Sequence, residues 1–167
     1  MRIPTRAEVD AFCGSPTTRW QRVLGVLAPA LLIGAIVFVL IRWPFLPERI
    51  PSNYNAAGEV TGYSGRGLLF LMPVIGLIGD AVIALVGRFP KSWNTGVRVT
   101  LYNRVRVYRA LRDLMAELRL GMALLFGGFS VYMSLLPAHF SGTVIILPLL
   151  LSIVPIVRYF ARSGRKG

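Results

Sequence analysis

Residues 46–63 read LPERIPSNYNAAGEVTGY, a long polar stretch that stands between two apolar runs. Pro47 and Pro51 each fix φ and bias the preceding residue away from helix. Asn55 and Gly58 stand three apart, which is the spacing of positions i and i+3 in a type I turn. A flexible tether needs none of these residues. The stretch is therefore predicted to be a compact, shaped loop rather than a simple connector.

The chain as a whole is apolar enough for a membrane protein. Its 167 residues are 54% hydrophobic, and the mean hydropathy is +0.61. An apolar helix of about 20 residues crosses a bilayer. The first apolar run is interpreted as a true span, because it is longer than the apolar core of a signal peptide and no small-residue cleavage site follows it. We predict an all-α membrane domain over residues 23–160, with spans at about 23–41, 68–86, 120–136 and 143–157 and an outer loop at 44–66.

The basic residues predict an orientation. Nineteen Lys and Arg oppose seven Asp and Glu, which gives a net charge of +12. In a soluble chain this charge would suggest nucleic acid, but in a membrane protein it is typical of topogenic charge and attraction to anionic lipid. Three of the nineteen, Arg42, Arg49 and Arg66, flank or lie in the loop between the first two spans. The others fall in residues 1–22, in 88–119 and from 158 onward, which includes the basic tail 161–167. We therefore expect a multi-pass protein of the inner (plasma) membrane with both termini in the cytoplasm and no nucleic-acid partner.

Two further helices are predicted on the cytoplasmic side. A capping-box pattern predicts a short helix near residues 6–12. Apolar residues recur every three or four positions over about 97–119, which predicts a basic amphipathic helix. This helix is expected to lie on the cytoplasmic leaflet or to extend the next span inward. Its arginines are expected to face anionic lipid or a cytoplasmic partner: Arg104, Arg106, Arg109 and Arg112.

Asp80 is the one acidic residue inside a predicted span. Gly76, Ala84 and Gly87 fall on the same helical face, so a neighbouring helix can approach closely there. An isolated carboxylate in a membrane is costly, and Asp80 is therefore expected to be protonated or paired. It is interpreted either as a proton or cation site or as a packing contact. In the second case a protonated Asp80 would donate to a backbone carbonyl that a proline leaves free, or Asp80 would accept from Ser152.

Enzyme and metal chemistry lack a supporting pattern. The sequence has no phosphate-cradling glycine loop, no Gly-x-Ser-x-Gly and no paired histidines for zinc. Cys13 has no second cysteine to pair with, and His139 is the one histidine. Glu48, Glu59 and Asn53 of the loop have no spacing that demands a cation with His139. We expect a non-enzymatic protein with no metal and no cofactor.

The loop resembles a family signature. It is similar to the pattern L-P-x-x-I-P-[ST]-H-[FWY]-N-x-x-G-x-x-D-G-Y of a bacterial and archaeal membrane domain of unknown function, found at the start of Sdp-type toxin-immunity and signalling proteins. Asn53 stands where that family usually has His, and Thr61 where it usually has Asp. A second stretch of resemblance runs from Pro90 through Asn94 and Asn103 into residues 120–133. The residues that match the signature are Leu46, Pro47, Ile50, Pro51, Ser52, Tyr54, Asn55, Gly58, Gly62 and Tyr63.

The resemblance implies immunity to a membrane-active peptide toxin, or sensing of one, with the outer loop as the recognition element. A second hypothesis is a small proton-coupled transporter or channel subunit that uses Asp80. A third is an accessory subunit of a larger membrane complex, so another membrane protein is a further candidate partner. The expected recognition residues are Pro47, Pro51, Asn53, Tyr54, Asn55, Gly58, Glu59 and Tyr63.

Overall fold

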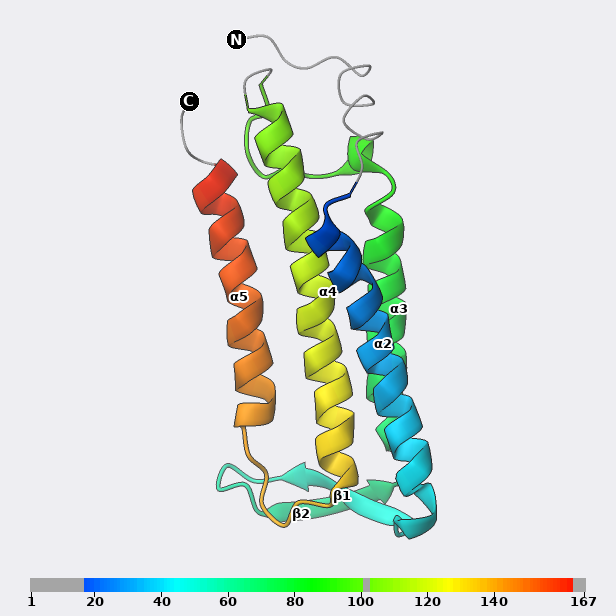
Figure 1. The fold of residues 1–167 in the computed structure, drawn as a ribbon. Coiled ribbons are helices and arrows are strands. Elements are labelled where there is room, and N and C mark those ends of the chain that lie inside the picture. Colours follow the sequence, from blue (N-terminus) through cyan, green and yellow to red (C-terminus); the bar gives the residue numbers. More distant parts are fainter. Residues whose placement is uncertain (1–16, 101–102, 164–167) are drawn as a thin grey trace.

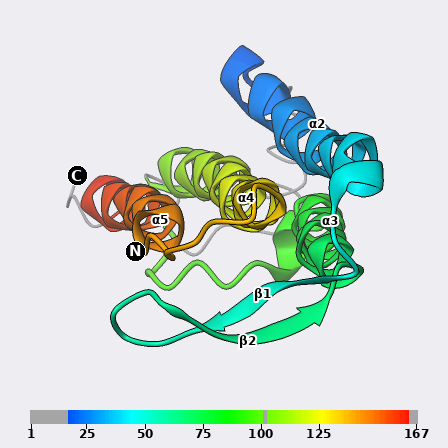
Figure 2. The same ribbon diagram turned by 90° about the horizontal axis from the view of Figure 1, so that it is seen from below.

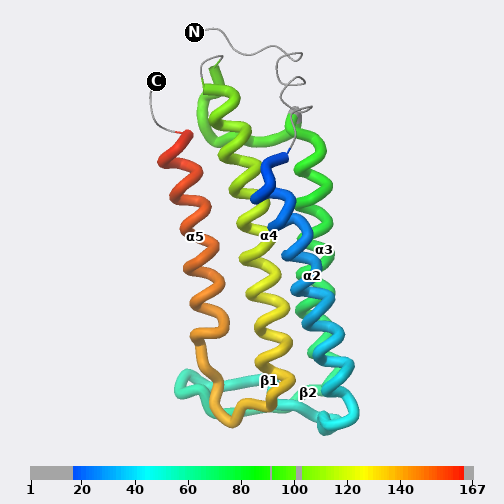
Figure 3. The backbone as a smooth tube through the Cα atoms, viewed as in Figure 1, coloured from blue at the N-terminus to red at the C-terminus, as the bar shows by residue number. Residues whose placement is uncertain are grey.

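The computed structural model describes residues 17–100 and 103–163, so the short helix predicted near residues 6–12 lies outside the described part of the chain. Four helices in this part are long and apolar enough to cross a membrane. They run alternately up and down, and the two ends of the described chain lie together, opposite a small β-hairpin (Figures 1 and 3). The four helices are α2 (Arg19–Arg42), α3 (Leu68–Val86), α4 (Arg104–Ser134) and α5 (Thr143–Ser163).

Helix α4 is the centre of the bundle, because it packs against α2, α3 and α5 (Figures 1 and 2). The buried residues of α2 recur at steps of three and four, which is the pattern of a helix with one packed face: Gln21, Leu24, Ala28, Leu32, Ala35 and Val39. Large apolar side chains on the other faces of α2, α3 and α5 are exposed. This arrangement fits helices whose outer faces meet lipid rather than water.

Small residues let the helices approach α4 closely. A Cβ on Gly76 of α3 would lie 2.6 Å from Cδ2 of Leu32 and 3.1 Å from Cβ of Phe126. On the opposite side of α4, a Cβ on Gly121 would collide with the hydroxyl of Ser152 in α5. Tight helix contacts at glycines are typical of packing between membrane helices.

The predicted outer loop contains β-structure, so the all-α prediction was incomplete. Strands β1 (Arg49–Tyr54) and β2 (Val60–Gly65) form a two-stranded antiparallel sheet after a short 3-10 turn, η1 (Trp43–Phe45). Pro51 is tolerated because both strands of a two-stranded sheet are edge strands, and edge strands are where a sheet accepts a residue without a backbone N–H. Figure 1 shows the hairpin at one end of the bundle, and Figure 2 shows it running alongside the row of α5, α4 and α3.

Of the two placements expected for the helix at 97–119, the structure has the second, since α4 runs unbroken from Arg104 to Ser134 and so joins this segment to the third span. It begins at 104 rather than 97. The preceding connection, with η2 (Pro90–Ser92), is anchored to the helices: the indole N–H of Trp93 donates to the carbonyl of Val86 (2.8 Å), and the Tyr159 hydroxyl donates to the carbonyl of Thr95. These bonds hold residues 87–100 across the end of the bundle opposite the hairpin.

Candidate functional site

The tip of the hairpin is a hydrogen-bonded turn. The N–H of Gly58 donates to the carbonyl of Asn55 (2.9 Å), which is the i to i+3 bond predicted from their spacing. The Asn55 side-chain oxygen accepts from the N–H groups of Ala57 (3.0 Å) and Glu59 (2.9 Å), and its amide donates to the Glu59 carboxylate (2.8 Å). Asn55 and Glu59 therefore shape the turn rather than reach outward.

Gly58 docks this turn onto the loop between α4 and α5. It has φ of 81°, a conformation that side chains with a Cβ rarely adopt. Its carbonyl accepts from the N–H of Phe140 (2.8 Å), and a Cβ at Gly58 would lie 2.8 Å from the Phe140 carbonyl oxygen. His139 enters the same contact through a backbone bridge to Glu59. No larger residue fits at position 58 without moving the turn.

The inner face of the hairpin packs on the helix ends. Ile50 is buried with Leu46, Leu69 and Met133 in one apolar cluster. The ring of Tyr54 lies 5.1 Å from that of Phe140, and burial raises the pKa of the Tyr54 hydroxyl above its ordinary value, with smaller contributions from neighbouring tyrosines. The hairpin is thus held on its inner face along its length.

Arg66 fastens the other end of the hairpin. Its guanidinium donates to the carbonyls of Trp43 (3.2 Å) and Leu46 (3.0 Å), and its Cζ lies 4.3 Å from the centre of the Trp43 ring. Hydrogen bonds and a cation–π contact therefore close residues 43–66 into one unit, which we call the hairpin cap.

The predicted recognition residues separate into two groups. Thr61 and Tyr63 lie on the exposed face of β2, and Asn53 of β1, at the bulge opposite Gly62, is exposed as well. Tyr63 keeps 61% of its surface exposed, and Phe45 at the base of the cap keeps 74%. Pro47 is also exposed, whereas Pro51 is half-buried. The other predicted residues, described above, build the cap.

Asp80 is paired with an arginine. The Arg119 Nε and Nη2 donate to the two carboxylate oxygens of Asp80 at 2.7 and 2.9 Å. Only 6% of the Asp80 side chain and 16% of the Arg119 side chain are exposed. The predicted contact with Ser152 is absent, because that hydroxyl donates to the Pro148 carbonyl in its own helix (2.8 Å). A bidentate pair satisfies both charges at once.

Sequence reasoning missed Arg119 because it was counted with the basic residues outside the membrane. Its position immediately before the third apolar run was the available signal. Because α4 is continuous, Arg119 lies well inside the helix, and its side chain reaches α2 and α3 rather than the leaflet surface.

Helix α4 also completes two backbone bonds that prolines leave open. Pro29 has no N–H to give to the carbonyl of Gly25, which instead accepts from Nη2 of Arg119 (3.0 Å). Pro73 likewise leaves the carbonyl of Leu69 free, and the Ser130 hydroxyl donates to it (2.6 Å). A free carbonyl is costly in a membrane, so these two side chains stabilise α2 and α3 at their proline positions.

The predicted basic face of α4 is divided by its surroundings. Arg106 and Arg109 are exposed, whereas Arg104 and Arg112 are half-buried. On another face of α4, the acids Asp113 and Glu117 meet Arg162 and Arg158 of α5, at 3.4 and 3.0 Å. These two ion pairs join α5 to α4 by charge as well as by apolar contact.

Comparison with known protein families gives a match for one segment of the chain. Residues 30–77 match the family model described as Domain of unknown function (DUF1648). The match runs from the middle of α2 through the hairpin cap into α3, and the second stretch of resemblance, from Pro90 onward, lies outside it. Neither the curated proteins nor the solved structures gave a match. Within the described residues, no three His, Cys, Asp or Glu side chains form a group that could hold a metal ion.

Proposed function

We propose that this chain is a non-enzymatic inner-membrane protein whose hairpin cap recognises a membrane-active peptide on the outer surface. The observation that carries the proposal is the difference between the packed and the exposed parts of the cap. Its inner face packs on the helix ends, its turn docks on the loop between α4 and α5, and Arg66 holds its base, while Asn53, Thr61 and Tyr63 stay exposed. A connector between two helices needs no such fixed surface. A preformed surface lowers the entropic cost of binding.

The charge distribution supports an outward-facing cap. Apart from Arg42, Arg49 and Arg66, the other sixteen of the nineteen Lys and Arg lie outside residues 42–66. Fifteen of these sixteen fall in segments predicted to be cytoplasmic, and the sixteenth, Arg119, lies in α4 next to such a segment. The exposed rings of Tyr63 and Phe45 suit an apolar or aromatic side chain of a peptide held near the bilayer surface. The resemblance to Sdp-type proteins supports a peptide toxin as the most concrete ligand.

The arrangement of Asp80 favours this role over proton-coupled transport. Both carboxylate oxygens of Asp80 accept hydrogen bonds from Arg119, and only 6% of the side chain is exposed, as expected of a packing contact between helices. We assign this pair a structural role, joining α3 to α4 and, through Gly25, to α2. An accessory-subunit role is compatible with the same bundle, but no contact within the described residues favours it.

The test is protection of growing cells. Cells expressing the chain are challenged with a panel of secreted membrane-active peptides, and the concentration of peptide that stops growth is compared with that for cells lacking the chain. We expect the native chain to raise this concentration for at least one peptide. Tyr63→Ala, combined with Thr61→Ala, is expected to reduce protection while the amount of protein in the membrane fraction stays the same.

A matched glycine pair provides the control for cap geometry. Gly58→Ala places a Cβ against Phe140 at a positive φ, whereas Gly65→Ala, also in the cap, meets no atom within 4 Å. Protection is expected to fall for the first and persist for the second. Absence of protection by the native chain against every peptide would contradict the immunity proposal. Full protection by a chain whose residues 47–63 are replaced by a Gly/Ser linker of equal length would reject the cap as the recognition element.

A further inference from the structure

Strand β2 has one edge without a partner. The sheet consists of two strands, and β1 pairs with the other edge of β2. Figure 2 shows the last part of β2, drawn in green, farther from the row of helices than β1. Among the described residues, only β1 exchanges backbone hydrogen bonds with residues 61–65. We call the edge of residues 63–65 that points away from β1 the free edge.

The register of the sheet shows which backbone groups lie at the free edge. The N–H of Arg66 donates to the carbonyl of Glu48 (3.0 Å), so these two residues form a hydrogen-bonded pair. Hydrogen-bonded and non-hydrogen-bonded pairs alternate along an antiparallel ladder. The pairs that contain Gly65 and Tyr63 are therefore non-hydrogen-bonded, which agrees with the missing N–H of Pro51 opposite Tyr63. The N–H and C=O groups of both residues point toward the free edge.

The sequence of β2 leaves this edge open to another strand. Proteins commonly prevent pairing at edge strands with proline or with charged side chains. Strand β2 reads VTGYSG and contains neither, whereas β1 carries Arg49 and Pro51. Tyr63 and Gly65 are also exposed, so a second backbone can approach them from the side.

The charge beside the free edge is positive. Arg49 stands directly opposite Gly65, and paired residues of two strands share one face of a sheet. Its side chain is exposed and, within the described residues, makes no hydrogen bond or ion pair. Neither strand contains an acidic residue. Of the two acids that flank the strands, Glu59 is bonded to Asn55 in the turn, and Glu48 precedes Arg49 and so points to the opposite side of the pleat.

We infer that the free edge binds an extended peptide segment by strand addition, with Arg49 paired to an Asp or Glu side chain of that segment. A row of unpaired N–H and C=O groups is complementary to another extended backbone, which gives the class of ligand. The unpaired cation gives the complementary charge. This inference rests on the proposed function for a peptide as the ligand, and it states how the hairpin cap holds that peptide.

The test is peptide binding to the full chain in phosphatidylcholine nanodiscs. A phage library of random short peptides is selected against the native chain, and enriched peptides are expected to alternate β-branched or aromatic residues and to contain Asp or Glu. An enriched peptide is then synthesised with N-methyl groups on one or the other alternate set of residues. Methylation of the set that faces β2 is expected to weaken binding about ten-fold or more, because several main-chain hydrogen bonds are lost. Methylation of the other set is the control and is expected to have little effect.

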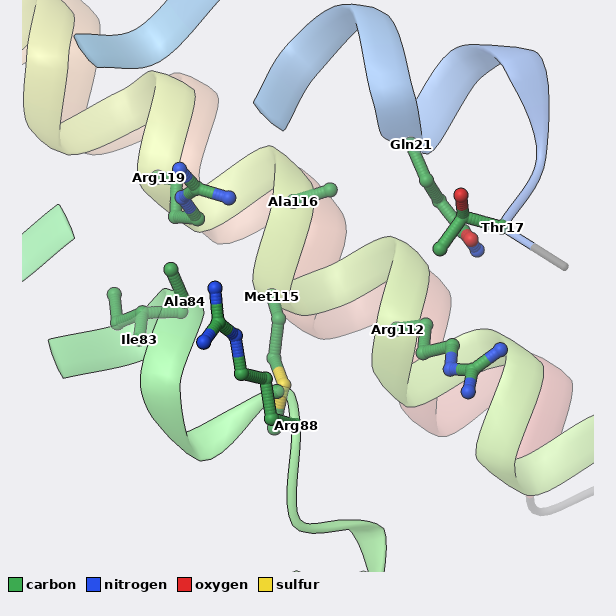
Figure 4. A pocket seen from close by; sticks show the side chains of 10 residues that line it. Thr17, Gln21, Ile83, Ala84, Arg88, Arg112, Met115, Ala116 and Arg119 are labelled. Atoms are coloured by element: carbon green, nitrogen blue, oxygen red, sulfur yellow. The ribbon is translucent and has the colours of Figure 1, made fainter. Parts of the chain in front are cut away.

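Two matched pairs of variants test the chain itself. Gly65→Pro removes an N–H that the ladder does not use, whereas Gly65→Ala keeps this N–H and meets no atom within 4 Å. The first is expected to weaken binding about three- to ten-fold and the second to leave it unchanged. Arg49→Gln is expected to weaken binding about two- to five-fold. Arg88→Gln is its control, because Arg88 is exposed and lines a cavity between α3 and α4 at the other end of the bundle (Figure 4).

Several outcomes would overturn strand addition at the free edge. These are the absence of any enriched peptide, equal binding of the two N-methylated forms, and equal binding by Gly65→Pro and Gly65→Ala. A disulfide between two copies of a Tyr63→Cys chain, in a Cys13→Ser background, would assign the edge to a second copy and reject the peptide. Binding as expected without protection of cells would contradict the proposed function alone. Protection of cells by a peptide whose binding is insensitive to N-methylation would contradict this inference alone.

Discussion

The contact between Asp80 and Arg119 is the most consequential at the residue scale, because it places two charges among the spanning helices and satisfies both. Removing one partner leaves the other charge buried and unpaired, which costs about 3–5 kcal/mol. We therefore predict that Arg119→Ala lowers the free energy of unfolding by about this amount. The double variant Asp80→Ala/Arg119→Ala is expected to lose less than the two single changes together. Denaturant titration in detergent micelles, followed by tryptophan fluorescence, measures each value.

Arg109→Ala is the comparison for this cycle, since Arg109 is an exposed arginine of the same helix. Its effect is expected to stay within about 0.5 kcal/mol. Strictly additive losses for Asp80 and Arg119 would mean that the two side chains do not stabilise one another.

At the scale of elements, α4 supplies the hydrogen bonds that prolines remove from its neighbours. Ser130→Ala leaves the carbonyl of Leu69 without a donor, and we predict a loss of about 1–3 kcal/mol. Pro73→Ala gives that carbonyl the N–H of residue 73, so Ser130→Ala is expected to cost much less in that background. Unfolding in detergent measures the four members of the cycle. If Ser130→Ala costs the same free energy of unfolding with and without Pro73, this role of α4 is refuted.

Ser134→Ala is the matched control, because Ser134 is a buried serine of the same helix whose hydroxyl donates within that helix, to Val131 (2.6 Å). Its cost is expected to be independent of Pro73.

The sequence predicted the positions of the helices better than the strands of the loop and the side-chain contacts between helices. Apolar run length was sufficient for α3, whose bounds are those predicted, and the proline and turn signals located the compact loop. The strands were missed because Pro51 and a bulge near Asn53 interrupt the alternation that indicates a strand. Arg119 was missed because pairing across 39 positions depends on helix packing, which no local pattern encodes.

For the whole molecule, the proposed function requires the hairpin cap to lie on the outer side of the membrane, where it would meet a secreted peptide. The fold places the cap at the end of the bundle opposite the two ends of the described chain and the connection between α3 and α4 (Figure 1). The side on which the cap lies is predicted from the distribution of Lys and Arg.

The measurement that tests this account most directly is labelling of single cysteines in intact cells with a membrane-impermeant maleimide, in a Cys13→Ser background. Thr61 on the hairpin cap and Ser92 in the connection between α3 and α4 are both exposed, so both report sidedness without unfolding. We predict that Thr61→Cys reacts in intact cells and that Ser92→Cys reacts only after the membrane is permeabilised. Reaction of Ser92→Cys from outside, with Thr61→Cys protected, would contradict the account.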